Sequence, residues 1–307
     1  MRASTTPVKY SLFNVDAFEW LKKRRSNSIH AIVTDPPYGI VEYTVDQLKK
    51  RRNGNGGIWR LPHNYDGHER SPTPRFTVLT RTDLKRVEEF HEQLAALLLK
   101  VLVPGGHVIV SSQTILSYIV ASGFSGAGFE MRGQIARIVK TLRGGDRPKG
   151  AHLKYANVSV VPRSCWEPWL IFRKPCEGRV KDNLKNWKTG GLRRPDKNIP
   201  FQDLINSRPA RGLEKSLAPH PSLKPQAFLR QVVRAALPLG DGIILDPFMG
   251  SGSTIAAATS LGFRSIGLEK NRAYYRMALR AVPCLSLLCL SSNGSVMWNR
   301  SLREPVK

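Results

Sequence analysis

The sequence predicts an α/β fold, a doubly wound and mostly parallel sheet covered by helices on both faces. Two observations predict it. Short apolar runs of the kind that buried parallel strands need alternate with segments of helical period along the 307 residues. No internal repeat is present, and the breaks in the alternation are long polar segments typical of insertions. A chain of this length can bury one large core.

The first third of the chain predicts two strands, at residues 10–14 and 29–34, with a short helix at 17–25 between them. A longer helix is expected from an N-cap at Thr82-Asp83 to about Val103, ended by Pro104-Gly105-Gly106. The intervening residues 41–82 are rich in Lys, Arg, Gly and Pro, which predicts a mobile basic loop.

The remaining strands and helices follow in the same alternating order. Residues 174–218 are polar and punctuated by Pro and Gly, which indicates an inserted region, and residues 283–307 form a tail of unknown role. The main domain is therefore expected to comprise residues 1–40, 83–173 and 219–282. Its further elements are strands at 107–111, 135–139, 169–172, 242–245 and 264–268, and helices at 226–237 and 254–261.

Charge narrows the class of partner. Lys and Arg number 48 against 23 Asp and Glu, a formal net charge of +25. A polyanion is the commonest reason for such a surplus, so nucleic acid leads over a merely soluble basic protein. A membrane surface is the other alternative, but no basic amphipathic helix supports it and no apolar stretch reaches the roughly 18 residues of a span.

The four cysteines show no metal-binding spacing, so no metal is expected. The N-terminus has no apolar signal core, which predicts a cytoplasmic protein.

The tetrapeptide Asp35-Pro36-Pro37-Tyr38 follows the apolar run at 29–34. Its carboxylate and its proline-fixed carbonyls offer acceptors for a planar amino group, and its aromatic ring offers a stacking face. The arrangement suits an extruded nucleobase. A Pro-Pro turn with a solvated Asp is the alternative interpretation of the tetrapeptide alone.

A second motif, residues 246–254, follows the apolar strand at 242–245 and opens a helix. A strand, a glycine turn and a helix in this order are typical of a site that binds a nucleotide-like ligand. Neither the P-loop lysine nor the third glycine of a dinucleotide fingerprint is present, and Asp246 would repel a pyrophosphate. An acid there suits a ligand carrying ammonium and sulfonium groups, such as S-adenosylmethionine, while Glu269 at the next strand end suits ribose hydroxyls.

Together, the two motifs resemble the amino-methylating DNA methyltransferases, which act on adenine N6 or cytosine N4. Their order, with the tetrapeptide first, resembles the permuted beta group of that family, and residues 165–172 and 220–225 are similar to further family segments. The resemblance implies a circularly permuted, Rossmann-like S-adenosylmethionine-dependent methyltransferase fold in which both motifs lie in adjacent loops, with residues 174–218 as the candidate target-recognition region. It also implies double-stranded DNA as the substrate. The implied catalytic residues are Asp35, Pro36, Pro37 and Tyr38, and the implied cofactor-binding residues are Asp16, Lys224, Asp246, Phe248, Gly250, Gly252 and Glu269.

Two of these assignments stay open at the level of sequence. Asp16 matches the family's acidic position near the cofactor adenine, but it could equally be the N-cap of the helix at 17–25. Lys224 would meet the methionine carboxylate of the cofactor, or it is a solvated lysine in a Pro-rich turn. For DNA contact, basic residues in and near the insertion are candidates, namely Arg143, Arg147, Lys149, Arg193 and Arg194.

Asp at the first position of the tetrapeptide favours adenine N6 over cytosine N4, whose enzymes usually carry Ser there. An RNA or protein methyltransferase fits less well, and a non-catalytic DNA-binding protein on the same fold is the rival from another class. Further expectations are a possible homodimer, a possible cognate restriction endonuclease, and a prokaryotic nucleoid or phage setting.

Overall fold

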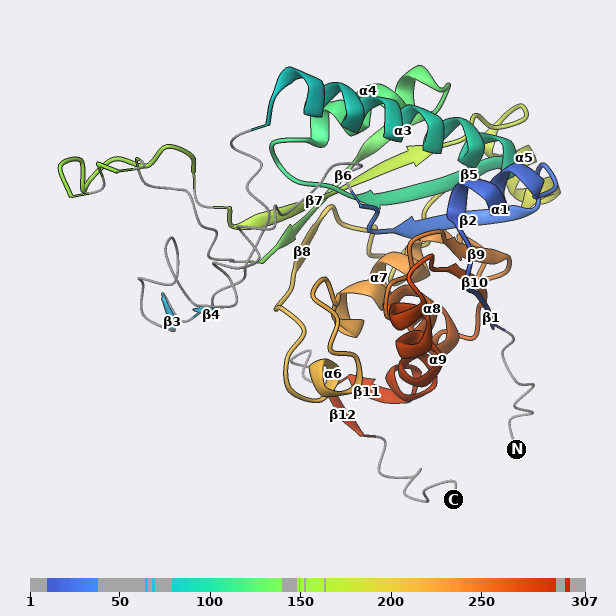
Figure 1. Cartoon of the computed structure of the whole chain (residues 1–307). Helices are drawn as coiled ribbons and strands as arrows, with labels where there is room; N and C mark the ends of the chain where they lie inside the picture. Colours follow the sequence, from blue (N-terminus) through green and yellow to red (C-terminus); the bar gives the residue numbers. More distant parts are fainter. Residues whose placement is uncertain are drawn as a thin grey trace.

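The computed structural model describes residues 10–37, 64–65, 68–69, 79–139, 148, 150–151, 153–162, 164–290 and 296–298. Its centre is an eight-stranded sheet in the order β1-β10-β9-β2-β5-β7-β6-β8 (Figure 1). The first five strands in that order are mutually parallel, while β7 runs antiparallel to β5 and β6, so the predicted mostly parallel sheet is confirmed. The strands are β1 (Tyr10–Phe13), β2 (Ile29–Thr34), β5 (Leu102–Ser111), β6 (Glu130–Ile138), β7 (Trp166–Arg173), β8 (Leu204–Asn206), β9 (Ile243–Asp246) and β10 (Arg264–Leu268).

Helices cover both faces of this sheet (Figure 1). Strand β2 shows why its sequence is mostly apolar: Ile32 packs into the core on one face, while Ala31 and Val33 pack into the core on the other. On the first face lie α1 (Ala17–Lys23), α3 (Arg81–Val101) and α4 (Ser117–Gly126), and on the second lie α7 (Gln226–Ala236), α8 (Ser253–Ser260) and α9 (Arg272–Ser286).

Several predicted boundaries are wrong, such as the start of β6, which is Glu130 and not residue 135, and two of them have a visible cause. Helix α3 begins two residues early because Thr80 is its N-cap: the Thr80 hydroxyl accepts from the Asp83 amide at 3.2 Å, and the Asp83 carboxylate accepts from the Thr80 amide at 3.0 Å. The Pro104-Gly105-Gly106 segment also lies within strand β5 and does not separate a helix from a strand. The register of β2 against β5 shifts there, which marks a bulge that admits the proline.

Residues 174–218 cross the sheet from one end of its strands to the other. Helix α5 (Val180–Trp187) is docked at the amino end of β5, where Asn183 Nδ2 donates to the Pro104 carbonyl at 3.0 Å. Strand β8 then pairs in parallel with the final residues of β6, and α6 (Gly212–Leu217) follows. The segment predicted as an insertion is therefore integrated into the edge of the sheet.

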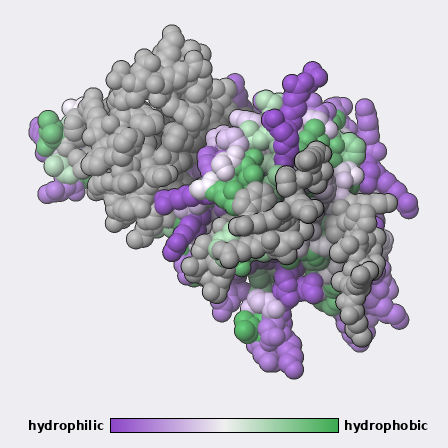
Figure 2. All heavy atoms as spheres, turned by 90° about the horizontal axis from the view of Figure 1, so that it is seen from below, coloured by the Kyte–Doolittle hydropathy of each residue, from purple (hydrophilic) through white to green (hydrophobic). Residues whose placement is uncertain are grey.

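Two small hairpins complete the described structure, β3 (Asn64–Tyr65) with β4 (His68–Glu69) and β11 (Leu288–Leu290) with β12 (Val296–Trp298). Most of the predicted loop at 41–82 lies outside the described residues. Figure 2 shows hydrophilic residues over most of the coloured surface on the face seen from below. Among the described helices, none has the length and apolar character needed to cross a membrane.

Candidate active site

The two sequence motifs meet at the carboxyl end of the sheet. Strands β2 and β9 are paired, and each is followed directly by one motif. Thr34, the last residue of β2, donates its hydroxyl hydrogen to Asp246 Oδ1 at 2.7 Å. This bond fixes the loop that contains Asp35 beside the loop that begins at Asp246, as expected for the crevice of a doubly wound sheet.

Asp246 is a buried carboxylate, with 3% of the residue exposed. It accepts hydrogen bonds from the Thr34 hydroxyl and from the Phe248 amide at 3.1 Å. Burial raises the pKa of Asp246 to about 6, and the neighbouring charge of Asp35 adds to the rise. Within the described part of the chain no Lys or Arg forms an ion pair with it, so this carboxylate suits a positively charged ligand.

Glu269 follows β10 and faces the glycine turn. Its two carboxylate oxygens accept from the Gly250 amide at 3.0 Å and the Asn271 amide at 2.6 Å. Burial raises the pKa of Glu269 despite these hydrogen bonds. A carboxylate oxygen has a second lone pair, so both oxygens can still accept from a ligand hydroxyl.

The turn itself depends on left-handed glycines. Gly250 has φ +53°, and a Cβ there would meet the His220 ring at 3.0 Å. Gly252 has φ +84°, and its Cβ would lie 2.3 Å from a methyl group of Val282 on α9. Both glycines are predicted from sequence to let the ligand approach the backbone closely, but the space beside Gly252 is filled by Val282 of α9.

Asp16 is the N-cap of α1, since its carboxylate accepts from the Phe18 amide at 2.9 Å and the Glu19 amide at 3.3 Å. It also forms an ion pair with Lys270 at 3.0 Å. This pair places Asp16 near the end of β10, so its role beside the cofactor adenine stays a prediction that is compatible with capping.

Lys224 contacts Asp35 directly through an ion pair between Nζ and Oδ2. A second carboxylate, that of Glu167, lies 3.3 Å from the same Nζ. Only 13% of the Lys224 side chain is exposed, so the interpretation as a solvated lysine is wrong. Contact with a cofactor carboxylate stays a prediction.

Several residues at this site were missed by sequence reasoning. Thr34, His220 and Glu167 lie against predicted site residues, and Arg137 pairs with Glu167. Glu167 carried a readable signal, because an acid inside the apolar run 166–172 must have a buried partner.

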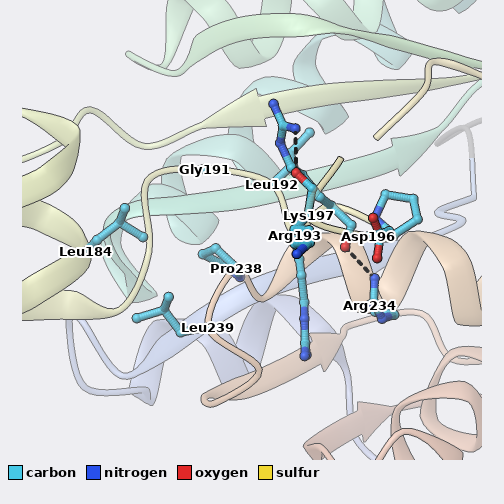
Figure 3. Close-up of a pocket in the computed structure, with 11 residues that line it drawn as sticks. Leu184, Gly191, Leu192, Arg193, Asp196, Lys197, Arg234, Pro238 and Leu239 are labelled. Carbon is cyan, nitrogen blue, oxygen red and sulfur yellow. Dashed lines mark hydrogen bonds between the residues drawn. The ribbon is translucent and has the colours of Figure 1, made fainter. Parts of the chain in front are cut away.

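Six predicted residues remain. Tyr38, Arg143, Arg147 and Lys149 lie outside the described residues, and Arg193 and Arg194 are not brought together with Asp35. Arg193 and Arg194 line an open pocket of about 570 Å³ (Figure 3). The Arg193 amide donates to the Ala235 carbonyl near the end of α7, so this pocket lies at the amino end of the strands, opposite Asp35.

This combination of a doubly wound sheet and two strand-end acids defines a class of enzymes that bind a nucleotide-like cofactor. The model of a family described as DNA methylase, N6_N4_Mtase, matches residues 29–280, and the chain belongs to this family of amino-methyltransferases. The chain is 27% identical over 294 residues to the type II methyltransferase M.HindIII of Haemophilus influenzae, covering 87% of this chain and 93% of that protein.

Two further comparisons agree with this assignment. Over 67 residues the chain is 43% identical to the DNA adenine methyltransferase YhdJ of Escherichia coli, a match that covers 22% of each protein. The fold is similar to that of the M1.HpyAVI–SAM complex, with a TM-score of 0.53 and 20% identity, covering 89% of this chain and 99% of that one.

Proposed function

We propose that this DNA methylase is a site-specific adenine methyltransferase, which transfers a methyl group to the exocyclic N6 of an adenine flipped out of the duplex. One observation carries the proposal: the Thr34–Asp246 hydrogen bond joins the strand ends that bear the two motifs. A base held at Asp35 and a cofactor held at Asp246 would therefore share one site.

S-adenosylmethionine is the methyl donor, and its sulfonium supplies an electrophilic methyl group when bound. The residues present fit it. Asp246 is buried without a cationic partner in the described structure, which suits the ammonium and sulfonium charges of such a ligand. Glu269 has free lone pairs for ribose hydroxyls, and the half-buried Phe248 lies beside the turn.

On the base side, this chain supplies acceptors at the end of β2. The amino nitrogen of adenine is a weak nucleophile because its lone pair is delocalised into the ring. Hydrogen bonds from its N–H groups to Asp35 and the Pro36 carbonyl would favour a pyramidal nitrogen with an available lone pair. Lys224 contacts Oδ2 of Asp35, and within the described residues no hydrogen bond to the other oxygen competes with the base. We assign Tyr38 to stacking on the flipped ring.

Asp35 supports adenine over cytosine, because it stands where cytosine-N4 enzymes of the family usually carry Ser. The local similarity to YhdJ, which is named a DNA adenine methyltransferase, favours the same choice. Cytosine N4 is the second candidate, since the family comprises both activities.

Mass spectrometry of nucleosides tests the proposal. Purified protein incubated with S-adenosylmethionine and methylation-free DNA should produce N6-methyladenine, and Asp35→Ala should lower the rate by at least about 10³-fold. Glu89→Ala is the control, because Glu89 lies on α3 outside residues 174–218, its side chain is 52% exposed, and it pairs only with Lys85 among the described residues. N4-methylcytosine in place of N6-methyladenine would contradict the choice of base, and unchanged transfer by Asp35→Ala would contradict the site.

The partners follow from this activity. Double-stranded DNA is the proposed substrate, in agreement with the net charge of +25. A cognate restriction endonuclease is proposed on the similarity to a type II methyltransferase, and a homodimer and a cytoplasmic location stay predictions.

A further inference from the structure

A buried ion pair joins two strands at the active-site end of the sheet. Arg137 on β6 and Glu167 on β7 are cross-strand partners, with Nη1 of the first 2.6 Å from Oε2 of the second. Their side chains are only 5% and 14% exposed. The Ser111 hydroxyl at the end of β5 donates to Glu167 Oε1 at 2.7 Å, so Glu167 is held from both neighbouring strands.

Lys224 connects this ion pair to Asp35, the proposed catalytic acid. The Lys224 ammonium lies between two carboxylates, in contact with Asp35 and 3.3 Å from Glu167. The two carboxylates raise the pKa of Lys224 although burial opposes the rise. Lys224 therefore stays charged, and its place is set by Glu167 as well as by Asp35.

At its other end, the pair contacts the candidate target-recognition region. Arg137 Nε donates to Ser207 Oγ at 3.0 Å, and Nη2 donates to the Arg208 carbonyl at 3.3 Å. Both residues follow β8 within residues 174–218. The guanidinium also lies 5.1 Å above the ring of Phe228 on α7, which limits the positions it can take.

We propose that Glu167 and Arg137 are positioning residues for methyl transfer: they hold Lys224 against Asp35, and they connect that acid to the segment at Ser207–Arg208. The inference rests on the proposed function, since it concerns the same site. Buried charges of this kind need every partner in place, because the loss of one leaves the others uncompensated. Loss of Glu167 or Arg137 should therefore change how Lys224 holds the Asp35 carboxylate.

The same two strands offer a matched control. Glu130 and Arg173 are cross-strand partners at the opposite end of the β6–β7 ladder, 2.5 Å apart, and Arg173 Nη1 donates to the Gly190 carbonyl at 2.8 Å. This pair has the same chemistry and also contacts residues 174–218, but it is distant from Asp35. The Glu130 side chain is 39% exposed against 14% for Glu167, so the two variants are compared by the methylation rate of folded protein, where a purely structural role predicts no difference.

Single-turnover methylation with saturating DNA and S-adenosylmethionine gives the rate constant of methyl transfer, and steady-state assays over a range of DNA concentrations give the KM. Glu167→Gln should lower the rate constant at least about 30-fold while the KM for DNA changes less than about 3-fold, because the orientation of Asp35 and not substrate binding is disturbed. Arg137→Lys should retain more activity than Arg137→Met, since it keeps the charge beside Glu167. Glu130→Gln should stay within about 3-fold of the unmodified protein.

Crystal structures of the two variants give a readout that is independent of activity. In Glu167→Gln the Lys224 ammonium should move away from Asp35 or lose its order, whereas in Glu130→Gln it should keep its place. The inference is overturned if Lys224 stays against Asp35 and the rate is unchanged in Glu167→Gln, or if Glu130→Gln loses as much activity. Absence of methylated base with the unmodified protein would instead refute the proposed function.

Discussion

At the scale of one residue, Asp246 shows how a group that suits ligand binding can lower the stability of the fold. Its carboxylate is buried beside a second acid, Asp35, and no described cation pairs with it. The cost appears as a pKa raised to about 6 from the ordinary 3.8. A cationic ligand would remove that cost, so part of the affinity of the site comes from relief of this burial penalty.

The pH dependence of stability tests this account. The folded protein binds the Asp246 proton more tightly than the unfolded chain, so this group favours the fold fully below about pH 4, and the contribution is lost as the pH rises to about 6. Asp246→Asn has no such dependence and keeps an acceptor for Thr34. Relative to the unmodified protein, the variant should gain about 2 kcal/mol in free energy of unfolding between pH 4.5 and 7.5.

Urea unfolding at the two pH values measures the difference. A pH-independent difference for Asp246→Asn would show that the carboxylate is not destabilised by burial.

At the scale of elements, the contact of α8 with α9 positions the glycine turn. The first residues of α8 are close to α9 because Gly252 leaves room for Val282. The turn that carries Gly250 and Phe248 is thus held in place by α9, a helix later in the chain. Cofactor affinity should therefore respond to α9, which does not itself bear a predicted site residue.

Alanine substitutions separate backbone strain from packing. Gly252→Ala should lower the free energy of unfolding by about 2–4 kcal/mol, because it combines a left-handed φ with a clash at Val282. Gly262→Ala is the control: its φ is +78°, but nothing lies within 4 Å of its Cβ position, so it should cost only about 1 kcal/mol. Thermal or urea unfolding gives both values.

Val282→Ala should partly restore the Gly252→Ala protein. If Gly252→Ala and Gly262→Ala are equally destabilised, the contact with Val282 has no energetic importance.

The strands could be predicted from sequence better than the contacts between them. Runs such as 29–34 and 264–268 are mostly apolar, and the structure has strands with these bounds. The start of α3 was misplaced because Thr80 and Thr82 are both good caps, and only the reciprocal bonds with Asp83 distinguish them. The bulge at Pro104 depends on the partner strand, which no local pattern describes.

The residues of the candidate site also differ in whether the sequence could predict them. Asp35 and Asp246 could be predicted because each lies in a compact motif at the end of an apolar strand. Glu167, Arg137 and Lys224 come from three separate segments, and they meet through cross-strand register and a turn before α7. Register is a property of the assembled sheet, so the ion-pair network could not be predicted from any one segment.

For the whole molecule, the distribution of basic residues matters more than their number. The predicted DNA contacts Arg193 and Arg194 lie at the amino end of the strands. The exposed Arg208 and Arg211 follow β8 at the carboxyl end, where Asp35 lies. A duplex that delivers a base to Asp35 should therefore meet the second pair and not the first.

Salt-dependent DNA affinity distinguishes the two ends. Arg208→Ala/Arg211→Ala should weaken binding by about 10-fold at physiological salt and reduce the slope of log K against log salt by about 2. Arg193→Ala/Arg194→Ala removes the same charge and should change affinity less than about 2-fold. The opposite ranking would place the duplex along the amino end of the sheet.

The Thr34–Asp246 hydrogen bond also has a consequence for synthesis of the protein. It joins residues 212 positions apart, across a pair of strands in the middle of the sheet. At a usual rate of 5–20 residues per second, β9 is translated roughly 10 to 40 s after β2. One edge of β2 therefore has no partner strand while the intervening chain is synthesised, and the site between Asp35 and Asp246 cannot form before β9 has left the ribosome.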